Sequence, residues 1–598
     1  MMNEQSTRAY GFHVQHRIMT FFTLLRPHWL RLLLGSLVLL CTNAVFASLP
    51  MIINAGVNAV KGSEPAAVFI ADISISLGNI TYVVISIICL AFFGAVLRTV
   101  SRMVLFDVGR LIERDVRAAL FFHVSLLDED YYSRVSIGNI MNHLTSDVSN
   151  VRMVVGFVVL NILNIVYVFS FAVPLLVHKD PLIAAAALLP FPLIALFMSG
   201  ITRSMFVATM EYQQALSNMV SHVQENLLGA QVVKAFHRQE QEGDRFFQAN
   251  DKTFYTGMRV AKYRMLMMPI MRLLVGISVG LVLYVGGSAV LEGRISLGDF
   301  VEINARIVQL AWPAMSVGFV MSIVSRGQAS LKRINDVLVT MPTLQDGTQE
   351  LSQVDRINVK NLAFAHAPKQ AQSTISFEIT LGSMMALVGP SGSFKSSVLR
   401  ALSRRCLVPK QSVCINDVDI NDFKLESLYK NISFVQQEPL LFGMTILDNL
   451  RFYNPSVSER EIDEVVKLLA LDRDMEGFLS GIHTVVGERG VSLSGGQRQR
   501  IAIGRALLAK HPILLLDDAL SAVDKETERH IVSHIKPFLK NMMVIASTHR
   551  LSLCTLADSI MVLDKGHIVE MGSHEALIHA KGMYRTLWDV EHQPGISS

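Results

Sequence analysis

The sequence has few cysteines and few charged residues for its length, and both shortages exclude classes of protein. The five cysteines among 598 residues are scattered and form no Cys-x-x-Cys pair, so neither a disulfide framework nor a zinc site is indicated. Charged residues make up only 17% of the chain and the mean hydropathy is +0.39, which is too apolar for a soluble protein of this length. The net charge of +4 is small and argues against nucleic acid as a partner.

Long apolar stretches are confined to residues 32–325, and no cleavable signal peptide is evident. A stretch of about 20 apolar residues is long enough to span a bilayer as a helix. Six spans are predicted, at residues 32–56, 78–105, 153–175, 182–202, 266–286 and 298–323. Basic and apolar residues mix over 14–31, which favours a helix in the cytoplasmic interface, the alternative being the start of the first span.

Two connections between spans, residues 106–152 and 203–265, are far longer than turns and keep helical periodicity. We expect the spanning helices to continue into water and to reverse there. Both connections are rich in Lys and Arg, whereas the opposite loops carry only Lys61, Lys179 and Arg294. The long connections and both termini are therefore predicted to be cytoplasmic.

Polar residues inside the predicted spans allow two interpretations. Glu302 and Arg306 are four residues apart on span six, hence on one helix face, and Asn161 and Asn164 of span three lie at comparable depth. They could form the polar wall of a substrate cavity. Alternatively, they form an intrahelical ion pair and hydrogen bonds between helices.

After a linker over residues 326–355, short strand-like runs alternate with helical ones, which indicates an α/β domain. A strand-like run, 384–388, leads into a loop typical of phosphate binding, in which glycines allow a tight turn, Lys395 can reach phosphates and Ser396 can hold Mg²⁺. The loop residues are Gly389, Pro390, Ser391, Gly392, Ser393, Phe394, Lys395, Ser396 and Ser397. Phe394 is unusual, because the pattern has glycine immediately before the lysine.

Further residues suit ATP chemistry. Asp517 ends an apolar strand and suits Mg²⁺ coordination, while Asp518 stands where a general base would address the attacking water. His549 ends another strand that should reach the same sheet edge. A second anion site is predicted at a helix start, formed by Ser494, Gly495, Gly496 and Gln497. A single domain cannot easily bring both anion sites, the phosphate-binding loop and this helix start, onto the same phosphate. A second copy of the domain is therefore implied.

These motifs, in this order, resemble those of an ATP-binding cassette (ABC) half-transporter of the exporter type. Residues 389–396 are similar to Walker A, 493–497 to the signature, 514–517 to Walker B and 521–524 to the D-loop. Gln437 matches the Q-loop glutamine, which also contacts the metal, and His549 matches the switch histidine. His366 stands where an aromatic residue, commonly Tyr, stacks on adenine in the family.

The resemblance implies two domains after an N-terminal segment and elbow over 1–31. The first is an all-α membrane domain of six helices over 32–325, and the second is an α/β P-loop NTPase cassette over 356–598. The cassette should have a parallel-sheet core, an antiparallel β subdomain and a helical signature subdomain. Two such chains would pair in the plasma (bacterial inner) membrane, with two ATP molecules and Mg²⁺ between cytoplasmic cassettes. The expected catalytic residues are Asp518, His549 and Gln437, with Ser396, Gln437 and Asp517 at the metal.

Departures from the family pattern bear on whether the chain pairs with an identical chain or with a different one. Phe394, Asp518 and His366 differ from the usual residues on the Walker face, whereas the signature is intact. We therefore expect a heterodimer in which the chain's own site hydrolyses slowly and its signature completes the partner's site. The expected activity is ATP-driven export of an amphipathic substrate (drug, lipid or peptide). The alternatives are a homodimeric lipid or multidrug flippase, a non-transporting ATP-gated or regulatory member, and an importer on the same fold.

Overall fold

The computed structural model describes residues 19–60, 67–70, 73–76, 80–363, 374–487 and 493–592. The chain forms two compact units. The membrane unit consists of Met1–Leu126 and Val135–Met341, and the cassette unit consists of Leu127–Arg134 and Pro342–Ser598. The cassette unit therefore includes a short segment that lies far upstream of its main part.

The membrane unit is built almost entirely from helices. Among the described residues, six helical stretches are long and apolar enough to cross a bilayer, as the sequence predicts. They are Phe21–Asn58, Thr81–Ser125, Ile137–Lys179, Pro181–Leu228, Gln239–Leu291 and Leu297–Val339. A bilayer requires only about 20 helical residues, and these stretches contain 38 to 53 residues, so they extend well beyond it.

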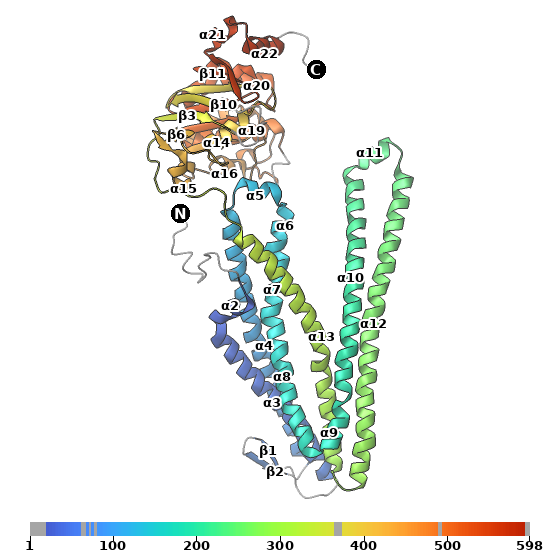
Figure 1. Cartoon of the computed structure of the whole chain (residues 1–598). Coiled ribbons are helices and arrows are strands. Elements are labelled where there is room, and N and C mark those ends of the chain that lie inside the picture. The colour runs from blue at the N-terminus through green and yellow to red at the C-terminus, as the bar shows by residue number, and fades with distance from the viewer. Residues whose placement is uncertain are drawn as a thin grey trace. The chain divides into compact units, whose positions relative to one another are not determined.

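Figure 1 shows these helices, with α10 and α12 side by side and joined through α11. The helices are α2 (Phe21–Leu25), η1 (Arg26–His28), α3 (Trp29–Val60), α4 (Ile80–Ser125), α6 (Ile137–Asn142), η2 (His143–Asp147), α7 (Val148–Met153), η3 (Val154–Val158), α8 (Val159–Lys179), α9 (Pro181–Leu188), α10 (Pro190–Leu228), α11 (Ala230–Ala235), α12 (Gln239–Leu291) and α13 (Leu297–Val339). Between α3 and α4, β1 (Ala67–Ile70) pairs antiparallel with β2 (Ile73–Ser76).

Local sequence signals explain several helix starts. The Asp180 carboxylate accepts hydrogen bonds from the N–H groups of Leu182 and Ile183 at 2.8 and 3.1 Å, and Pro181 occupies the first position of α9. Ser296 and Asp299 form a capping box at the start of α13. Proline residues also mark the break between α9 and α10, because Pro190 lacks the N–H that would continue the helix.

The predicted interfacial helix over 14–31 is only partly within the described residues. From Met19 onward the chain forms α2, with Thr20 as its N-cap, and then the 3₁₀ turn η1 before α3 begins at Trp29. Residues 14–18 of that prediction lie outside the described part of the chain.

Glu302 and Arg306 form the ion pair that one of the two interpretations predicted. Their side chains are each 1% exposed, and an Arg306 nitrogen lies 2.6 Å from Glu302 Oε1. Arg306 also donates to the Ala47 carbonyl of α3 at 3.2 Å, and Asn54 of α3 donates to Glu302 Oε2 at 2.7 Å. In this structure the pair therefore connects α13 to α3.

The cassette unit contains two sheets of different type, as the sequence predicts. The six-stranded sheet has the order β12-β11-β5-β10-β9-β8, in which all neighbours are parallel except β11 and β12. Its strands are β5 (Met384–Val388), β8 (Ile432–Val435), β9 (Ile513–Asp517), β10 (Met543–Ser547), β11 (Ser559–Asp564) and β12 (His567–Gly572). Apolar residues cover both faces of its central strands β5 and β10, so these strands are apolar throughout, whereas the edge strand β12 alternates.

The second sheet is antiparallel, with the order β4-β3-β6-β7. Its strands are β3 (Arg356–Leu362), β4 (Ile375–Thr380), β6 (Val413–Ile415) and β7 (Val418–Asp419). The helices of the cassette unit are α5 (Glu129–Arg134), α14 (Lys395–Leu402), η4 (Ile420–Asp422), α15 (Leu425–Tyr429), α16 (Ile446–Leu450), α17 (Glu459–Leu468), α18 (Leu471–Met475), η5 (Gly481–His483), α19 (Gly495–Ala509), α20 (Lys525–Leu539), η7 (Leu551–Leu556), α21 (His574–His579) and α22 (Met583–His592).

The α5 segment packs within the cassette unit. The Asp128 carboxylate accepts a hydrogen bond from the Thr343 N–H at 2.7 Å, and Glu129 pairs with Arg400 of α14 at 3.6 Å. Hydrogen bonds from Thr343 and nearby backbone groups hold the pKa of Asp128 below its usual value, although partial burial opposes them. These contacts join α5 to the helix that follows the phosphate-binding loop.

Candidate functional site

Four adjacent parallel strands bring the predicted site residues to one edge of the sheet. The phosphate-binding loop follows β5, His549 follows β10, Asp517 ends β9 and Gln437 follows β8. Because the carboxyl ends of parallel strands share an edge, residues far apart in the sequence meet there. His366, the remaining Walker-side residue, lies outside the described residues.

Glycine is required where the loop leaves β5. A Cβ atom on Gly389 would lie 2.0 Å from the Leu563 carbonyl oxygen of β11, so no other residue fits without moving that strand. Gly392 has φ of +80°, which glycine adopts without strain. The loop can therefore turn tightly enough to direct its N–H groups inward at the start of α14.

Lys395 lies inside this loop. Its side-chain nitrogen donates to the carbonyl oxygens of Gly389 and Pro390 at 2.8 and 3.0 Å, and lies 3.4 Å from Ser393 Oγ. The residue is only 7% exposed, and burial lowers the pKa of its ammonium group, although Asp518 and Asp517 oppose the shift. The loop thus holds one cationic group where an anion bound by the loop's N–H groups would lie.

Hydroxyl and carboxylate oxygens gather beside the lysine. Ser396 Oγ donates to Asp517 Oδ1 at 2.8 Å, and Ser547 Oγ donates to the same oxygen at 2.5 Å. Mg²⁺ prefers such hard oxygen ligands, usually one or two from protein together with phosphate and water. The donor set of Ser396 and Asp517 therefore fits the ion that an ATP site requires.

Asp518 lies between the Q-loop and the switch segment. Its carboxylate accepts from the His549 N–H at 3.3 Å and from the Gln437 side-chain amide at 3.4 Å. Asp518 is 7% exposed and has φ of +47°, a left-handed conformation that Asp tolerates better than most residues. The structure thus brings together the three residues predicted to be catalytic.

The signature residues form the start of α19, a 15-residue helix. Ser494 and Gln497 make a reciprocal capping box, and the Gln497 side chain donates to Asp474 at 2.8 Å. A Cβ atom on Gly496 would lie 2.8 Å from the Ala522 carbonyl oxygen of the D-loop, which explains why glycine is needed there. The helix N-terminus, with the positive end of its dipole, is suited to an anion.

Gln499, which sequence analysis did not single out, connects these loops. It is 3% exposed, and its side-chain amide donates to the Gln437 carbonyl at 2.9 Å and to Ser521 Oγ at 3.0 Å. Its side-chain oxygen accepts from the Ala522 N–H at 2.9 Å. The only sequence signal would have been a polar residue on the buried face of a helix.

Arg550, also missed, holds the D-loop from the other side. Its guanidinium donates to the carbonyl oxygens of Ser521 and Val523 at 2.6 and 2.5 Å and pairs with Glu528 of α20. The D-loop backbone is thus bound both by the signature helix and by the segment that carries His549.

Phe394 closes the loop in a strained conformation. It has φ of +73° and ψ of +18°, in the left-handed region, where a bulky residue is a genuine outlier. Such a conformation costs on the order of 1–3 kcal/mol, which the surrounding structure must offset. The structure therefore retains the loop's shape in spite of the missing glycine.

The fold and the site together define a P-loop ATPase domain on the same chain as a membrane-spanning helical bundle. Residues 32–314 match the family "ABC transporter transmembrane region", and residues 372–521 match the family "ABC transporter".

Relatives of known name match along most of their length. An "ATP-dependent lipid A-core flippase" of Desulfotalea psychrophila is 32% identical over 511 residues, covering 84% of this chain and 89% of the relative. A "Multidrug resistance-like ATP-binding protein MdlA" of Escherichia coli is 29% identical over 517 residues, covering 86% and 87%. The solved structure of a bacterial Atm1-family ABC exporter with ATP bound has a TM-score of 0.77 at 24% identity, covers 94% of this chain and 99% of its own, and so shares the fold.

The chain belongs to the ABC transporter family and is a half-transporter of the exporter type. It is an ATP hydrolase coupled to transport and a multi-pass protein of the inner membrane, with its ATPase domain on the cytoplasmic side.

Proposed function

We propose that the chain pairs with a second half-transporter and exports an amphipathic drug, lipid or peptide by alternating access. Relatives named as a lipid A-core flippase and as multidrug resistance-like support this substrate class. A membrane unit with six long helices and few internal charges is suited to such molecules, because an amphipathic substrate can enter from the bilayer.

Each group of site residues has its own role in binding or hydrolysing ATP. Loop residues 389–397 would hold the phosphates, with Lys395 on the outer ones. Ser396, which hydrogen-bonds Asp517, would hold Mg²⁺ together with Asp517 and Gln437. Bound Mg²⁺ would neutralise charge that develops on the phosphates. Asp518 orients the attacking water, and His549 stabilises the γ-phosphate end of the site. The signature residues Ser494, Gly495, Gly496 and Gln497 contact the nucleotide held by the partner's Walker residues.

One observation favours a heterodimer with a slow site of its own. Asp518 has one methylene less than the family's usual glutamate, which withdraws the carboxylate by about 1.5 Å. A misplacement near 1 Å can reduce the rate about 10²-fold. The signature helix, in contrast, is fully capped and seated on the D-loop. Its contribution to catalysis is therefore made mainly to the partner's ATP.

Reconstituted vesicles test the activity. The assembled transporter should accumulate a fluorescent amphiphile in inside-out vesicles only with ATP and Mg²⁺, and Lys395→Ala combined with alanine at the partner's corresponding lysine should abolish accumulation. Outward movement in the same vesicles would indicate an importer, and ATP hydrolysis without any accumulation would indicate a non-transporting member. Either result would contradict the proposal.

Dimer composition is a separate measurement. The chain purified alone should form no dimer with full ATPase activity, whereas co-expression with its partner should restore turnover. A fully active dimer of identical chains would show instead that the protein is a homodimeric flippase.

A further inference from the structure

The start of α19 is held by a carboxylate from a neighbouring helix, Asp474 of α18. Asp474 Oδ1 accepts a hydrogen bond from the Gln497 side-chain amide at 2.8 Å, and Asp474 Oδ2 lies 2.7 Å from a guanidinium nitrogen of Arg500. The Asp474 side chain is 21% exposed, so most of it lies inside the cassette unit. One acidic residue thus contacts two residues of the helix whose first turn carries the signature.

Arg500 fixes the position of this carboxylate. Its side chain is buried and donates to the carbonyl oxygens of Leu469 and Ala470 at 3.2 and 2.8 Å. These two residues directly precede α18, so Arg500 binds the backbone at the start of that helix as well as the carboxylate within it. Hydrogen bonds from a charged group are stronger than neutral ones. They seat α18 against α19, with Asp474 beside Gln497.

The orientation of the Gln497 amide depends on its neighbours, because half a rotation would exchange its oxygen and nitrogen. Gln497 Oε1 accepts from the Ser494 N–H at 2.9 Å, while the amide nitrogen donates to Asp474. A carboxylate only accepts hydrogen bonds, so Asp474 favours the orientation that directs the amide nitrogen toward itself. The amide oxygen is then left for Ser494, where it completes the capping box.

Ser494 is held in place by this capping box. Its Oγ accepts from the Gln497 N–H at 3.2 Å, and its own N–H is bound by Gln497 Oε1. A hydroxyl group that accepts a hydrogen bond in this way can still donate its proton. The proton is thus available to a phosphate oxygen at the helix N-terminus, where the helix dipole also favours an anion.

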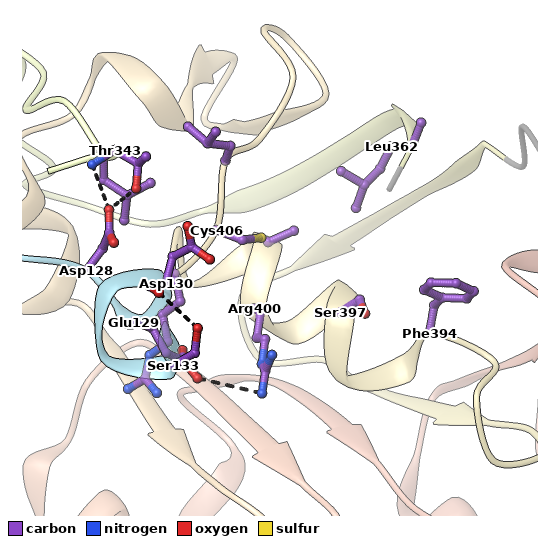
Figure 2. Close-up of a pocket in the computed structure, with 15 residues that line it drawn as sticks. Asp128, Glu129, Asp130, Ser133, Thr343, Leu362, Phe394, Ser397, Arg400 and Cys406 are labelled. Atoms are coloured by element: carbon purple, nitrogen blue, oxygen red, sulfur yellow. Dashed lines mark hydrogen bonds and ion pairs between the residues drawn. The ribbon is translucent and has the colours of Figure 1, made fainter. Parts of the chain in front are cut away.

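The chain's own phosphate-binding loop has a different set of neighbours. A cavity of about 460 Å³ lies beside this loop, and Figure 2 shows Phe394 and Ser397 toward one end of it and α5 toward the other. Neither Asp474 nor any of the described signature residues is among the residues that line this cavity. We therefore expect a change at Asp474 to affect the signature and to leave the phosphate-binding loop undisturbed.

We propose that Asp474 is a positioning residue for the signature. It orients the Gln497 amide, the amide closes the capping box, and the capping box directs the Ser494 hydroxyl toward a phosphate oxygen of the ATP that the partner's Walker residues hold. This inference rests on the proposed pairing, in which the signature completes the partner's site. The ion pair between Asp474 and Arg500 has a separate role, which is to stabilise the packing of α18 on α19.

Two variants at Asp474 separate positioning from stability. Asp474→Asn keeps an oxygen that can accept from Gln497 but loses the charge beside Arg500, whereas Asp474→Ala loses both. Asp472→Ala, which removes an exposed carboxylate from the same helix, is the matched control. Each variant is assembled with the partner, and ATP hydrolysis is measured in two backgrounds. Lys395→Ala leaves only the partner's site active, and alanine at the partner's corresponding lysine leaves only the chain's own site active.

The expected loss is confined to one site. With only the partner's site active, Asp474→Ala should lower kcat about tenfold and leave the KM for ATP nearly unchanged, because misplaced catalytic groups slow the chemical step. Asp474→Asn should keep most of the turnover. With only the chain's own site active, both variants should hydrolyse ATP as the unmodified chain does. Both should lower the melting temperature to a similar extent, because both lose the ion pair, and Asp472→Ala should change neither quantity.

Three results would overturn the inference. Equal loss of turnover in Asp474→Ala and Asp474→Asn would mean that only the ion pair with Arg500 matters. Equal loss at both ATP sites would mean that Asp474 only supports the fold of the cassette unit. Unchanged turnover in Asp474→Ala would exclude a role in hydrolysis. Ser494→Arg tests the premise separately, because a partner's site that stays active in that variant would refute the proposed pairing and this inference with it.

Discussion

The proposed slow site depends first on Asp518. Its carboxylate lies within 3.4 Å of both the Gln437 amide and the His549 backbone, so its neighbours orient the residue. In the proposal, the short side chain is the feature that limits hydrolysis.

We predict that Asp518→Glu will raise ATP turnover of the assembled transporter by about 10²-fold at the chain's own site, because the carboxylate regains the missing reach. Steady-state hydrolysis is measured in a complex whose partner site has been inactivated. Asp518→Asn serves as the control and should remain slow. Unchanged turnover in the glutamate variant would show that another residue limits the site.

Cysteine chemistry provides an independent check on the packing of the cassette unit. Cys554 is buried beside Tyr584, and burial raises the pKa of its thiol to about 12. The thiolate is therefore absent until the pH approaches that value. At pH 8, iodoacetamide should leave Cys554 unmodified until denaturant is added, as measured by mass spectrometry. Rapid native labelling of Cys554 would contradict this packing.

At the scale of single residues, the sequence predicted those whose chemistry is recognisable by type and spacing. Lys395, Asp517 and Asp518 could be identified because phosphate and Mg²⁺ chemistry demands those groups after strands. Gln499 and Arg550 could not, because they bind backbone and hydroxyl groups of loops distant in sequence. No local pattern records such contacts.

Helix α13 depends on a buried ion pair. Glu302→Gln leaves the Arg306 guanidinium without its carboxylate partner in a low-dielectric setting, which should cost about 3–5 kcal/mol of stability. Arg306→Met should cost less, because Lys179 Nζ lies 3.6 Å from Glu302 and remains as a partner of the carboxylate. The double variant should lose less, because neither charge remains. Thermal unfolding in detergent measures the difference. The exposed pair Glu426–Lys430 on the cassette unit is the control, and its removal should not shift the melting temperature.

Equal destabilisation by the single and double variants would show that Asn54 and Ala47, rather than the pair itself, determine the packing of α13 on α3.

Helix α19 should couple the two loops that it contacts. Gln499→Met keeps the side-chain volume and removes three hydrogen bonds, each worth about 1 kcal/mol. Because these bonds position the Q-loop and the D-loop, we expect ATP turnover to fall roughly tenfold or more while ATP affinity stays nearly unchanged, and the lost bonds should also lower the melting temperature. Steady-state kinetics, calorimetry and thermal unfolding measure the three quantities. A lower melting temperature with wild-type turnover would indicate a purely structural role.

Secondary-structure elements could be predicted from the sequence where a regular hydrophobic pattern continues over many residues. The six spanning stretches follow from length and apolarity, and the long helices beyond the bilayer follow from sustained periodicity. The π-helical turns η2 and η3 were not foreseen, because one extra residue in a turn leaves the apolar pattern almost unchanged. The strands of the β1–β2 hairpin are too short for an alternating apolar and polar pattern to be recognised in the sequence between two spans.

At the scale of the whole transporter, the proposal predicts an asymmetry between two variants of this chain. Ser494→Arg, which blocks the signature end of α19, should abolish most ATPase activity of the assembled complex, because the partner's site needs that surface. Lys395→Ala should remove only the smaller share contributed by the chain's own site. Hydrolysis by each purified complex is compared at saturating ATP. A greater loss from Lys395→Ala would reverse the assignment of the fast and slow sites.

The cassette unit is formed by two separate segments of the chain, and this limits how chimeric transporters can be built. Leu127–Arg134 packs with residues that follow Pro342, through Asp128 on Thr343 and Glu129 on Arg400. A chimera that took everything after Pro342 from a relative would leave the recipient's α5 against a foreign surface. Exchanging ATPase domains between half-transporters therefore requires transferring both segments together, as one discontinuous module.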